Sequence, residues 1–232
     1  MLKLRKAQER GHANHGWLDT HHSFSFGRYY DPEQLGFRTL RVINDDSIDG
    51  GAGFPFHSHQ DMEIISYVTE GALEHKDSMG NGSVIRPGDV QIMSAGTGVE
   101  HSEFNHLKDA KTHLIQIWIH PETTGLEPSY AEKHFDDVQL DDQLRLIVSP
   151  DGRNGSLVIR QDAAIYAARL TAGTTVGHRL AENRHAWLQI VSGAATVNGE
   201  AVSGGDGVAI SDETALEIRA TEATEILLFD LT

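Results

Sequence analysis

The chain of 232 residues contains no cysteine and only six prolines, and its 34 acidic residues far outnumber its 19 Lys and Arg residues. The absence of cysteine excludes disulfide frameworks, thiolate zinc sites, iron–sulfur clusters and cysteine nucleophiles. A net charge of −15 argues against nucleic acid as a direct partner and against a basic membrane-surface protein. No segment has the apolar length of a signal-peptide core or a membrane span, so we expect a cytoplasmic protein.

Alternation of apolar and polar side chains with a period of two dominates the chain, as in half-buried strands. The clearest strands are expected at 62–69, 89–93 and 112–119. Later strands are expected at 144–148, 157–160, 165–170, 187–191, 195–197, 208–210, 216–219 and 226–229. Only residues 128–135, which begin with proline, have a helix-like pattern. Many short strands separated by Gly-containing turns predict an all-β sandwich, jelly roll or barrel.

A short pattern occurs twice along the chain. Residues 66–71, which end a strand at Gly71, are echoed by 188–193, and the Gly-Asp turn at 87–92 is echoed by 204–210. Such turns are common in β proteins, but their paired order favours a duplication. We therefore expect two copies of one β fold, at residues 1–130 and 144–232, joined by a connector at 131–143.

The chain has 14 histidines, and two pairs of side chains have the spacing of metal ligands. His57 and His59 are two residues apart, as are His101 and Glu103, so each pair projects to one face of an extended segment. If the two segments are neighbours, three imidazoles and one carboxylate converge. Such ligands suit Fe(II), Mn, Ni, Cu(II) or Zn. One His-x-His is expected by chance in so His-rich a chain, so histidines that merely alternate remain the alternative.

Two motifs around these pairs resemble those of cupins, small jelly-roll β-barrels that hold a metal ion. The first is Gly51-x5-His57-x-His59-x3-Glu63, and the second runs from Gly88 through Ser94 to His101-x3-Asn105. The match has three departures: seven residues separate Glu63 from Gly71, Ser94 replaces a proline, and two extra residues precede His101.

These departures resemble one branch of the cupins, the pirin family. The stretches that carry this resemblance are 10–26, 56–59 and 99–103. It implies two jelly-roll barrels, with iron bound by His57, His59, His101 and Glu103, and with Glu63 supporting the site without binding the metal. The C-terminal half has no His-x-His, and His178 and His185 lack a partnered second pair, so we expect its barrel to be metal-free.

The resemblance implies a metal-dependent dioxygenase similar to quercetin 2,3-dioxygenase, which opens a flavonol ring with O2 and releases CO. Glu103 would then be a ligand, a general base, or both. The alternatives are an iron-responsive regulatory protein and a storage barrel. Phe24, Phe26 and Phe56 are candidates for an apolar substrate wall. For His12, His15, His21 and His22 we favour packing and hydrogen bonding over lining or covering the cavity, and we expect a monomer.

Overall fold

The computed structural model describes residues 1–232 and divides into two compact units. The N-terminal unit contains Gly11–His134 and Ile159–Gln161, and the C-terminal unit contains Met1–Arg10, Phe135–Val158 and Asp162–Thr232. The first ten residues therefore depart from the expected boundary. They belong to the C-terminal unit because β1 (Leu2–Arg5) pairs antiparallel with β20 (Gly207–Ile210).

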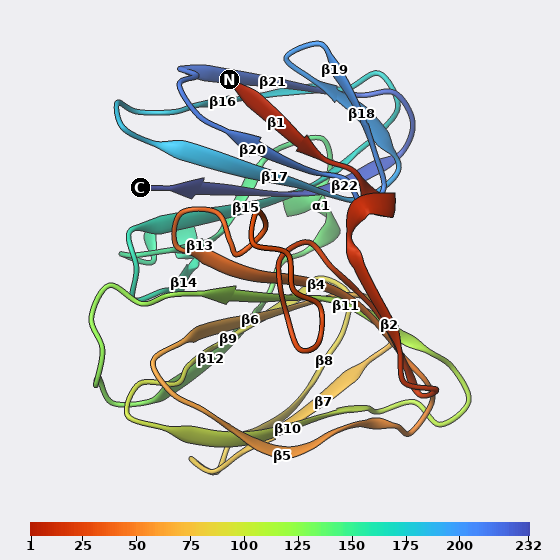
Figure 1. The fold of residues 1–232 in the computed structure, drawn as a ribbon, viewed down its shortest axis with the longest axis vertical. Helices are drawn as coiled ribbons and strands as arrows, with labels where there is room; N and C mark the ends of the chain where they lie inside the picture. Colours follow the sequence, from red (N-terminus) through yellow and green to blue (C-terminus); the bar gives the residue numbers. More distant parts are fainter. The chain divides into compact units, whose positions relative to one another are not determined.

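The N-terminal unit consists of two sheets that face each other (Figure 1). The larger sheet has the order β12-β9-β6-β11-β4-β3-β2, and the smaller has the order β5-β10-β7-β8. The larger sheet contains β2 (Gly11–Asn14), β3 (Leu18–His22), β4 (Leu40–Ile48), β6 (Glu63–Glu70), β9 (Asp89–Ser94), β11 (Thr112–Ile119) and β12 (Ser129–His134). The smaller sheet contains β5 (Gly53–His59), β7 (Leu73–Asp77), β8 (Gly82–Ile85) and β10 (Val99–Asn105). Apolar clusters such as Val68, Leu73, Ile85 and Leu114 fill part of the space between the sheets.

The helix expected at 128–135 is wrong. Residues Ser129–His134 form strand β12, which pairs antiparallel with β9 over six positions from Ser129↔Ser94 to His134↔Asp89. Pairing with an otherwise free sheet edge satisfies the backbone groups of this segment, so the tertiary context outweighs its local helix preference. The expected connector accordingly starts inside a strand, and the one α-helix, α1 (Asp137–Leu140), follows it.

The C-terminal unit repeats the arrangement of two sheets. Its larger sheet has the order β1-β20-β17-β22-β15-β13-β14, and its smaller sheet has the order β16-β21-β18-β19. The remaining strands are β13 (Arg145–Ser149), β14 (Leu157–Val158), β15 (Ala163–Leu170), β16 (Thr175–Arg179), β17 (His185–Ser192), β18 (Ala194–Val197), β19 (Glu200–Ser203), β21 (Ala215–Ala220) and β22 (Thr224–Leu231). A continuous apolar cluster that includes Leu188, Ile190, Ile218, Ile226 and Leu228 fills this unit.

The expected all-β fold with two jelly-roll units is confirmed, and every strand expected from the alternation pattern overlaps a strand of the structure. The alternation pattern did not yield several short strands, among them β1, β2, β3, β7, β8, β16 and β19. None of the helices has the length and apolar character needed to cross a membrane.

Candidate metal centre

Strand pairing in the smaller sheet of the N-terminal unit brings the two ligand-spaced pairs together. In the antiparallel register of β5 and β10, His57 lies directly opposite His101, and His59 lies opposite Val99. Because side chains alternate along a strand, His59 projects on the same side as His57, and Glu103 on the same side as His101. The nitrogens of His57, His59 and His101 lie within 4.8 Å of one another.

An irregularity in β5 fixes the orientation of His57. The register between β5 and β10 shifts between His101 and Glu103, so that His101 opposes His57 but Glu103 opposes Phe54. The additional β5 residue lies next to Pro55, which has no N–H to donate to a neighbouring strand. The carbonyl oxygen of Pro55 accepts a hydrogen bond from Nδ1 of His57 at 2.8 Å, which leaves the Nε2 lone pair for a metal ion.

The other two imidazoles are held in the neutral form. Burial, together with the neighbouring histidines, lowers the pKa of His59 to about 4 and that of His101 to about 3. His101 is 1% exposed, and neither of its ring nitrogens has a hydrogen-bond partner. A buried imidazole without partners is costly unless something else occupies its lone pair. The three converging imidazoles therefore fit a divalent transition metal.

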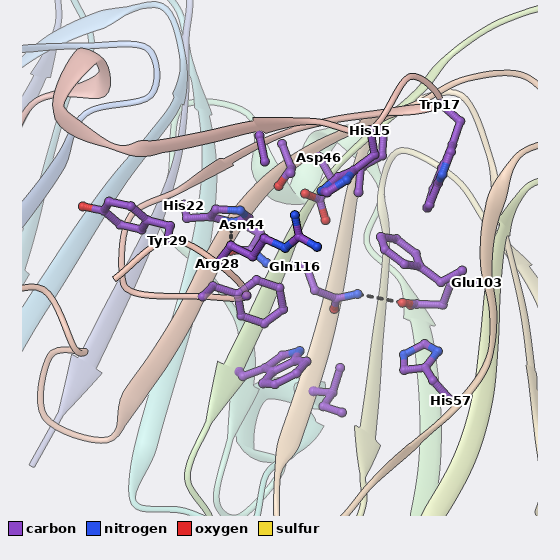
Figure 2. Close-up of a pocket in the computed structure, with 18 of the residues that line it drawn as sticks. His15, Trp17, His22, Arg28, Tyr29, Asn44, Asp46, His57, Glu103 and Gln116 are labelled. Carbon is purple, nitrogen blue, oxygen red and sulfur yellow. Dashed lines mark hydrogen bonds between the residues drawn. The ribbon is translucent and has the colours of Figure 1, made fainter. Parts of the chain in front are cut away.

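Glu103 lies beside the histidine triad and is held by the opposite sheet. Its two carboxylate oxygens accept hydrogen bonds from the Ser66 hydroxyl at 2.9 Å and from the Gln116 side-chain amide at 2.7 Å. Figure 2 shows the second of these bonds. Glu103, His101 and His75 form a second group, whose ligand atoms also lie within 4.8 Å of one another. Each oxygen still has a free lone pair, so the carboxylate can accept a proton or bind a cation.

His75, which had no apparent partner in the sequence, lies at the centre of this group. It faces Glu103 across the β7–β10 pair and is fully buried against His101, with ring centroids 5.4 Å apart. Its Nε2 donates to Asp77 at 3.2 Å, and its Nδ1 accepts from Gln91 at 3.4 Å. Since both nitrogens are occupied, His75 supports the wall behind His101 and offers no free lone pair to a metal.

A cavity of about 800 Å³ opens in front of the triad. Aromatic side chains line much of it, and His59 packs edge-on against Trp118 at 4.9 Å. The aromatic lining residues are Trp17, Phe26, Tyr29, Phe54 and Trp118. The volume falls in the range of roughly 300–1,000 Å³ that is usual for small-molecule sites. The cavity is therefore large and apolar enough for a planar aromatic ligand.

The wall formed by the larger sheet carries a row of polar side chains. His22, Asn44, Gln116 and Ser66 occupy directly paired positions on β3, β4, β11 and β6. The ring of His22 donates to Asn44 at 2.8 Å, and the Ser66 hydroxyl oxygen, which donates to Glu103, lies 3.2 Å from Oε1 of Gln116. Figure 2 shows His22 and Asn44 on the opposite side of the cavity from His57 and Glu103. A ligand that reaches across the cavity meets hydrogen-bonding groups at both ends.

Asp46 lines the same wall and is 3% exposed. Burial, and after it the negative charges of Asp45 and Glu103, raise the pKa of Asp46 to about 7. Near neutral pH this carboxyl group is therefore present in both protonation states, and it can donate or accept a hydrogen bond.

The loop between β3 and β4 forms one rim of the cavity. Phe26 and Tyr29 exchange two backbone hydrogen bonds around Gly27, whose φ of +58° suits glycine, and this turn presents Arg28 to the cavity. Gly11 on β2 allows the Tyr29 ring to pack closely, because a Cβ at Gly11 would lie 2.3 Å from the ring. Arg28 points into the cavity in Figure 2.

Several interpretations from the sequence change with this geometry. His12, His15 and His22 line the cavity, whereas His21 is not among the lining residues. His12 and His22 also make the expected hydrogen bonds, to Asp19 and Asn44. Of the candidate aromatic wall, Phe26 lines the cavity, Phe24 is 2% exposed in the core, and Phe56 is 58% exposed on the outside. Phe56 points away because it alternates with the inward-facing His57.

Glu63 lies outside the histidine cluster, at the start of β6. It is 1% exposed and accepts hydrogen bonds from the Ser94 hydroxyl at 2.7 Å and from the backbone N–H of Arg160 at 3.1 Å. Its environment is that of a structural carboxylate. In the C-terminal unit, His178 bonds to Asp230 at 2.8 Å, and His185 bonds to Ser211 at 2.8 Å.

Comparison with known proteins identifies the family of the chain. The Pirin family model matches residues 3–119, and a model described as quercetinase C-terminal cupin domain matches residues 146–231. The chain belongs to the pirin family. It is 52% identical to a protein of Escherichia coli K12 named quercetin 2,3-dioxygenase, over all of this chain and 99% of that protein. It is 40% identical to a pirin-like protein of Caulobacter vibrioides, over 99% of both chains.

Solved structures agree with this assignment. The crystal structure of E. coli YhhW has a TM-score of 0.96 and 52% identity, and covers 100% of this chain and 98% of that one. A structure described as the bacterial pirin YhhW in complex with nickel(II) has a TM-score of 0.95 and 50% identity, and covers 100% of this chain and 99% of that one. The expected pirin resemblance and two-cupin fold are confirmed, and the chain is similar to a quercetin 2,3-dioxygenase along its whole length.

Proposed function

We propose that this pirin is a metal-dependent dioxygenase that opens the heterocyclic ring of a flavonol such as quercetin with O2 and releases CO. The observation that carries the proposal is the position of the triad: three imidazoles with metal-ligand spacing lie at the wall of an aromatic cavity of about 800 Å³. The name of the E. coli relative supports the same reaction.

His57, His59 and His101 would hold one divalent metal ion, with Glu103 as a fourth ligand or as a base beside it. A bound divalent metal would acidify the flavonol hydroxyl and provide open positions for small ligands. Iron(II) is the ion that the pirin resemblance implies, and nickel(II) is the ion described for the E. coli relative. Imidazole and carboxylate ligands accept both ions, since selectivity for such sites follows availability as well as affinity.

The protein would supply binding, orientation and proton transfer. Trp17, Phe54 and Trp118 stack against the flat rings of the substrate, and Glu103 accepts the proton of its reacting hydroxyl. Ser66 and Gln116 keep the Glu103 carboxylate pointed at that position. The polar residues on the far wall, Asn44 and Asp46, would bind the hydroxyl groups of the other ring. The whole cavity is formed by the N-terminal unit, so a monomer suffices.

Oxygen uptake with quercetin tests the proposal. Metal-free protein is reconstituted separately with Fe(II), Mn(II), Ni(II), Cu(II) and Zn(II), and CO is measured in the headspace. We expect uptake only with a metal, and none in His101→Ala. His178→Ala is the matched control, because it removes a hydrogen-bonded histidine from the C-terminal unit and should change neither metal content nor uptake.

Failure of turnover with every metal, in protein whose histidine triad holds the ion, would contradict the enzymatic proposal. That result would favour the alternative, an iron-responsive regulatory protein in which the same site senses the metal. Full metal occupancy in His101→Ala would contradict the site itself.

A further inference from the structure

A second group of metal-ligating side chains lies on the hairpin formed by β2 and β3. The antiparallel register pairs His12 with His21 and Asn14 with Asp19. Asp19 and His21 are two residues apart on β3, so all four side chains project on one face of the hairpin. This face combines two imidazoles, one carboxylate and one amide within two pairs of the ladder.

The distances approach those of a coordination sphere. Oδ1 of Asp19 lies 3.1 Å from Nε2 of His12 and 3.8 Å from Nδ1 of His21. Two ligand atoms that each lie about 2.0–2.2 Å from one ion are separated by roughly 3–3.5 Å. The two imidazole rings are stacked, with centroids 4.4 Å apart and planes inclined by 12°. All three ligand atoms lie within 4.8 Å of one another, and rotation of these half-exposed side chains can bring them onto one ion.

The carboxylate of Asp19 is also oriented by a hydrogen bond to its second oxygen, as ligands of metal sites generally are. The Asn14 side-chain amide donates to Oδ2 of Asp19 at 2.8 Å, and Oδ1 of Asn14 accepts from the backbone N–H of Gly16 at 2.8 Å. Gly16 has a φ of +86°, so the tight turn of the hairpin holds Asn14 in place. Oδ1 of Asp19 is thereby left facing both histidines.

We propose that His12, Asp19 and His21 form a second binding site for a divalent transition-metal ion such as Ni²⁺, Zn²⁺ or Cu²⁺. An ion there replaces the proton that lies between Nε2 of His12 and Asp19 and is bound by two nitrogens and one oxygen, which suits these metals. The side chains of His12, Asp19 and His21 are 53%, 35% and 37% exposed, so water completes the coordination. Since His12 also lines the cavity, the second ion lies at the cavity rim.

The proposal does not depend on the dioxygenase activity, and Ni²⁺ binding alone tests it. In equilibrium dialysis we expect the wild-type protein to bind two Ni²⁺ ions per chain, and His57→Ala/His101→Ala to bind one. Adding His21→Ala or Asp19→Asn to that double variant should abolish the remaining binding. Asn14→Ala, which removes only the support of Asp19, should weaken the second site by about tenfold or more.

His106→Ala in the same background is the matched control. His106 is another half-exposed histidine paired with a carboxylate, Glu74 at 3.0 Å, but it has no second imidazole beside it. Its removal should leave binding unchanged. If the double variant fails to fold, single variants of the wild type serve instead, and His21→Ala should lower the stoichiometry from two ions to one.

A stoichiometry of one in the wild type, or a second ion that His21→Ala and Asp19→Asn do not remove, would overturn the proposal. In the first case the cluster is a hydrogen-bonded feature of the hairpin, and in the second the additional ion binds elsewhere.

Discussion

The ring of His57 donates a hydrogen bond through Nδ1 to the carbonyl oxygen of Pro55, two residues earlier on the same strand. The bond exists because β5 is irregular at this point, where its register against β10 shifts. It fixes which nitrogen of His57 faces the cavity, a choice that residue spacing alone leaves open. His101 differs, since both of its nitrogens are buried and unpartnered.

The first prediction concerns the free energy of unfolding of the metal-free protein. Replacing His101 with Leu removes two unsatisfied buried nitrogens, each of which costs about 1–3 kcal/mol. Because Leu has a similar volume and no polar atoms, we expect the metal-free His101→Leu variant to be about 1 kcal/mol more stable than metal-free wild type. Denaturant unfolding checks this. Addition of metal should stabilise the wild type more than the variant, which keeps only the proposed site on the β2–β3 hairpin.

A metal-free His101→Leu variant less stable than the wild type would mean that His101 has a structural partner. The same outcome would weaken the case that its unpaired nitrogens exist to bind a metal.

The second prediction concerns Gln116, whose amide holds Oε2 of Glu103 at 2.7 Å. Gln116→Met removes a hydrogen bond to a carboxylate, an interaction that contributes about 1.5–3 kcal/mol. If Glu103 accepts the substrate proton, kcat for quercetin should fall about tenfold or more with a smaller change in KM. Metal content should remain at the wild-type level. Gln189→Met is the control, because Gln189 is equally buried but lies in the C-terminal unit.

A loss of metal from Gln116→Met in proportion to the loss of rate would show that Gln116 acts through the ligand set. An unchanged kcat would remove Glu103 as the base.

The sequence was most informative where the chemistry depends on strand alternation. His57 and His59, or His101 and Glu103, share a face in any extended strand, so their convergence required only that β5 and β10 be neighbours. His75 could not be found in this way. It reaches the group because β7 pairs with the other edge of β10, and no spacing in the sequence records that pairing.

The residues of the cavity wall could not be predicted from the sequence, for a similar reason. Asn44 and Gln116 are adjacent only because β4 pairs with β11, 72 residues later in the chain. The segment 128–135 shows the opposite error, in which local preference predicted a helix but pairing with β9 made a strand. Strands with strong apolar–polar alternation were predictable from the sequence. The pairing of strands far apart in the chain was not, and neither were the side chains that this pairing brings together.

The third prediction concerns Asp46 and pH. Its pKa is raised from 3.8 to about 7 in the folded protein, chiefly by burial, so folding favours the protonated form. The unfavourable contribution of Asp46 to stability is therefore absent below about pH 4, grows as the pH rises and is complete above about pH 7. Asp46→Asn removes it. We expect the variant to gain stability relative to wild type between pH 5 and pH 8, by at most about 4 kcal/mol.

Thermal melts of the metal-free proteins at several pH values check this expectation, because a cation near Glu103 would itself lower the pKa of Asp46. A difference between Asp46→Asn and wild type that does not change with pH would contradict the raised pKa.

The fourth prediction has the opposite sign and concerns Asp206 in the C-terminal unit. Asp206 is 1% exposed and accepts hydrogen bonds from the backbone N–H groups of Ala7 at 2.8 Å and Ser203 at 3.0 Å, and from Lys6 Nζ at 3.1 Å. Burial opposes its ionisation, but these bonds outweigh burial and lower its pKa. Its stabilising contribution is present above about pH 4, the unfolded value, and is lost as the pH falls through the folded pKa.

Asp206→Ala should therefore destabilise the C-terminal unit by about 2–4 kcal/mol at pH 7, because it leaves two partly buried N–H groups and an ammonium without their acceptor. The loss should shrink below pH 4, where the wild-type carboxylate is itself protonated. Since Asp206 anchors the residues that follow β1, limited proteolysis should cut the first ten residues of the variant faster than those of the wild type. Equal cleavage rates would mean that the pairing of β1 with β20 alone holds the N-terminus.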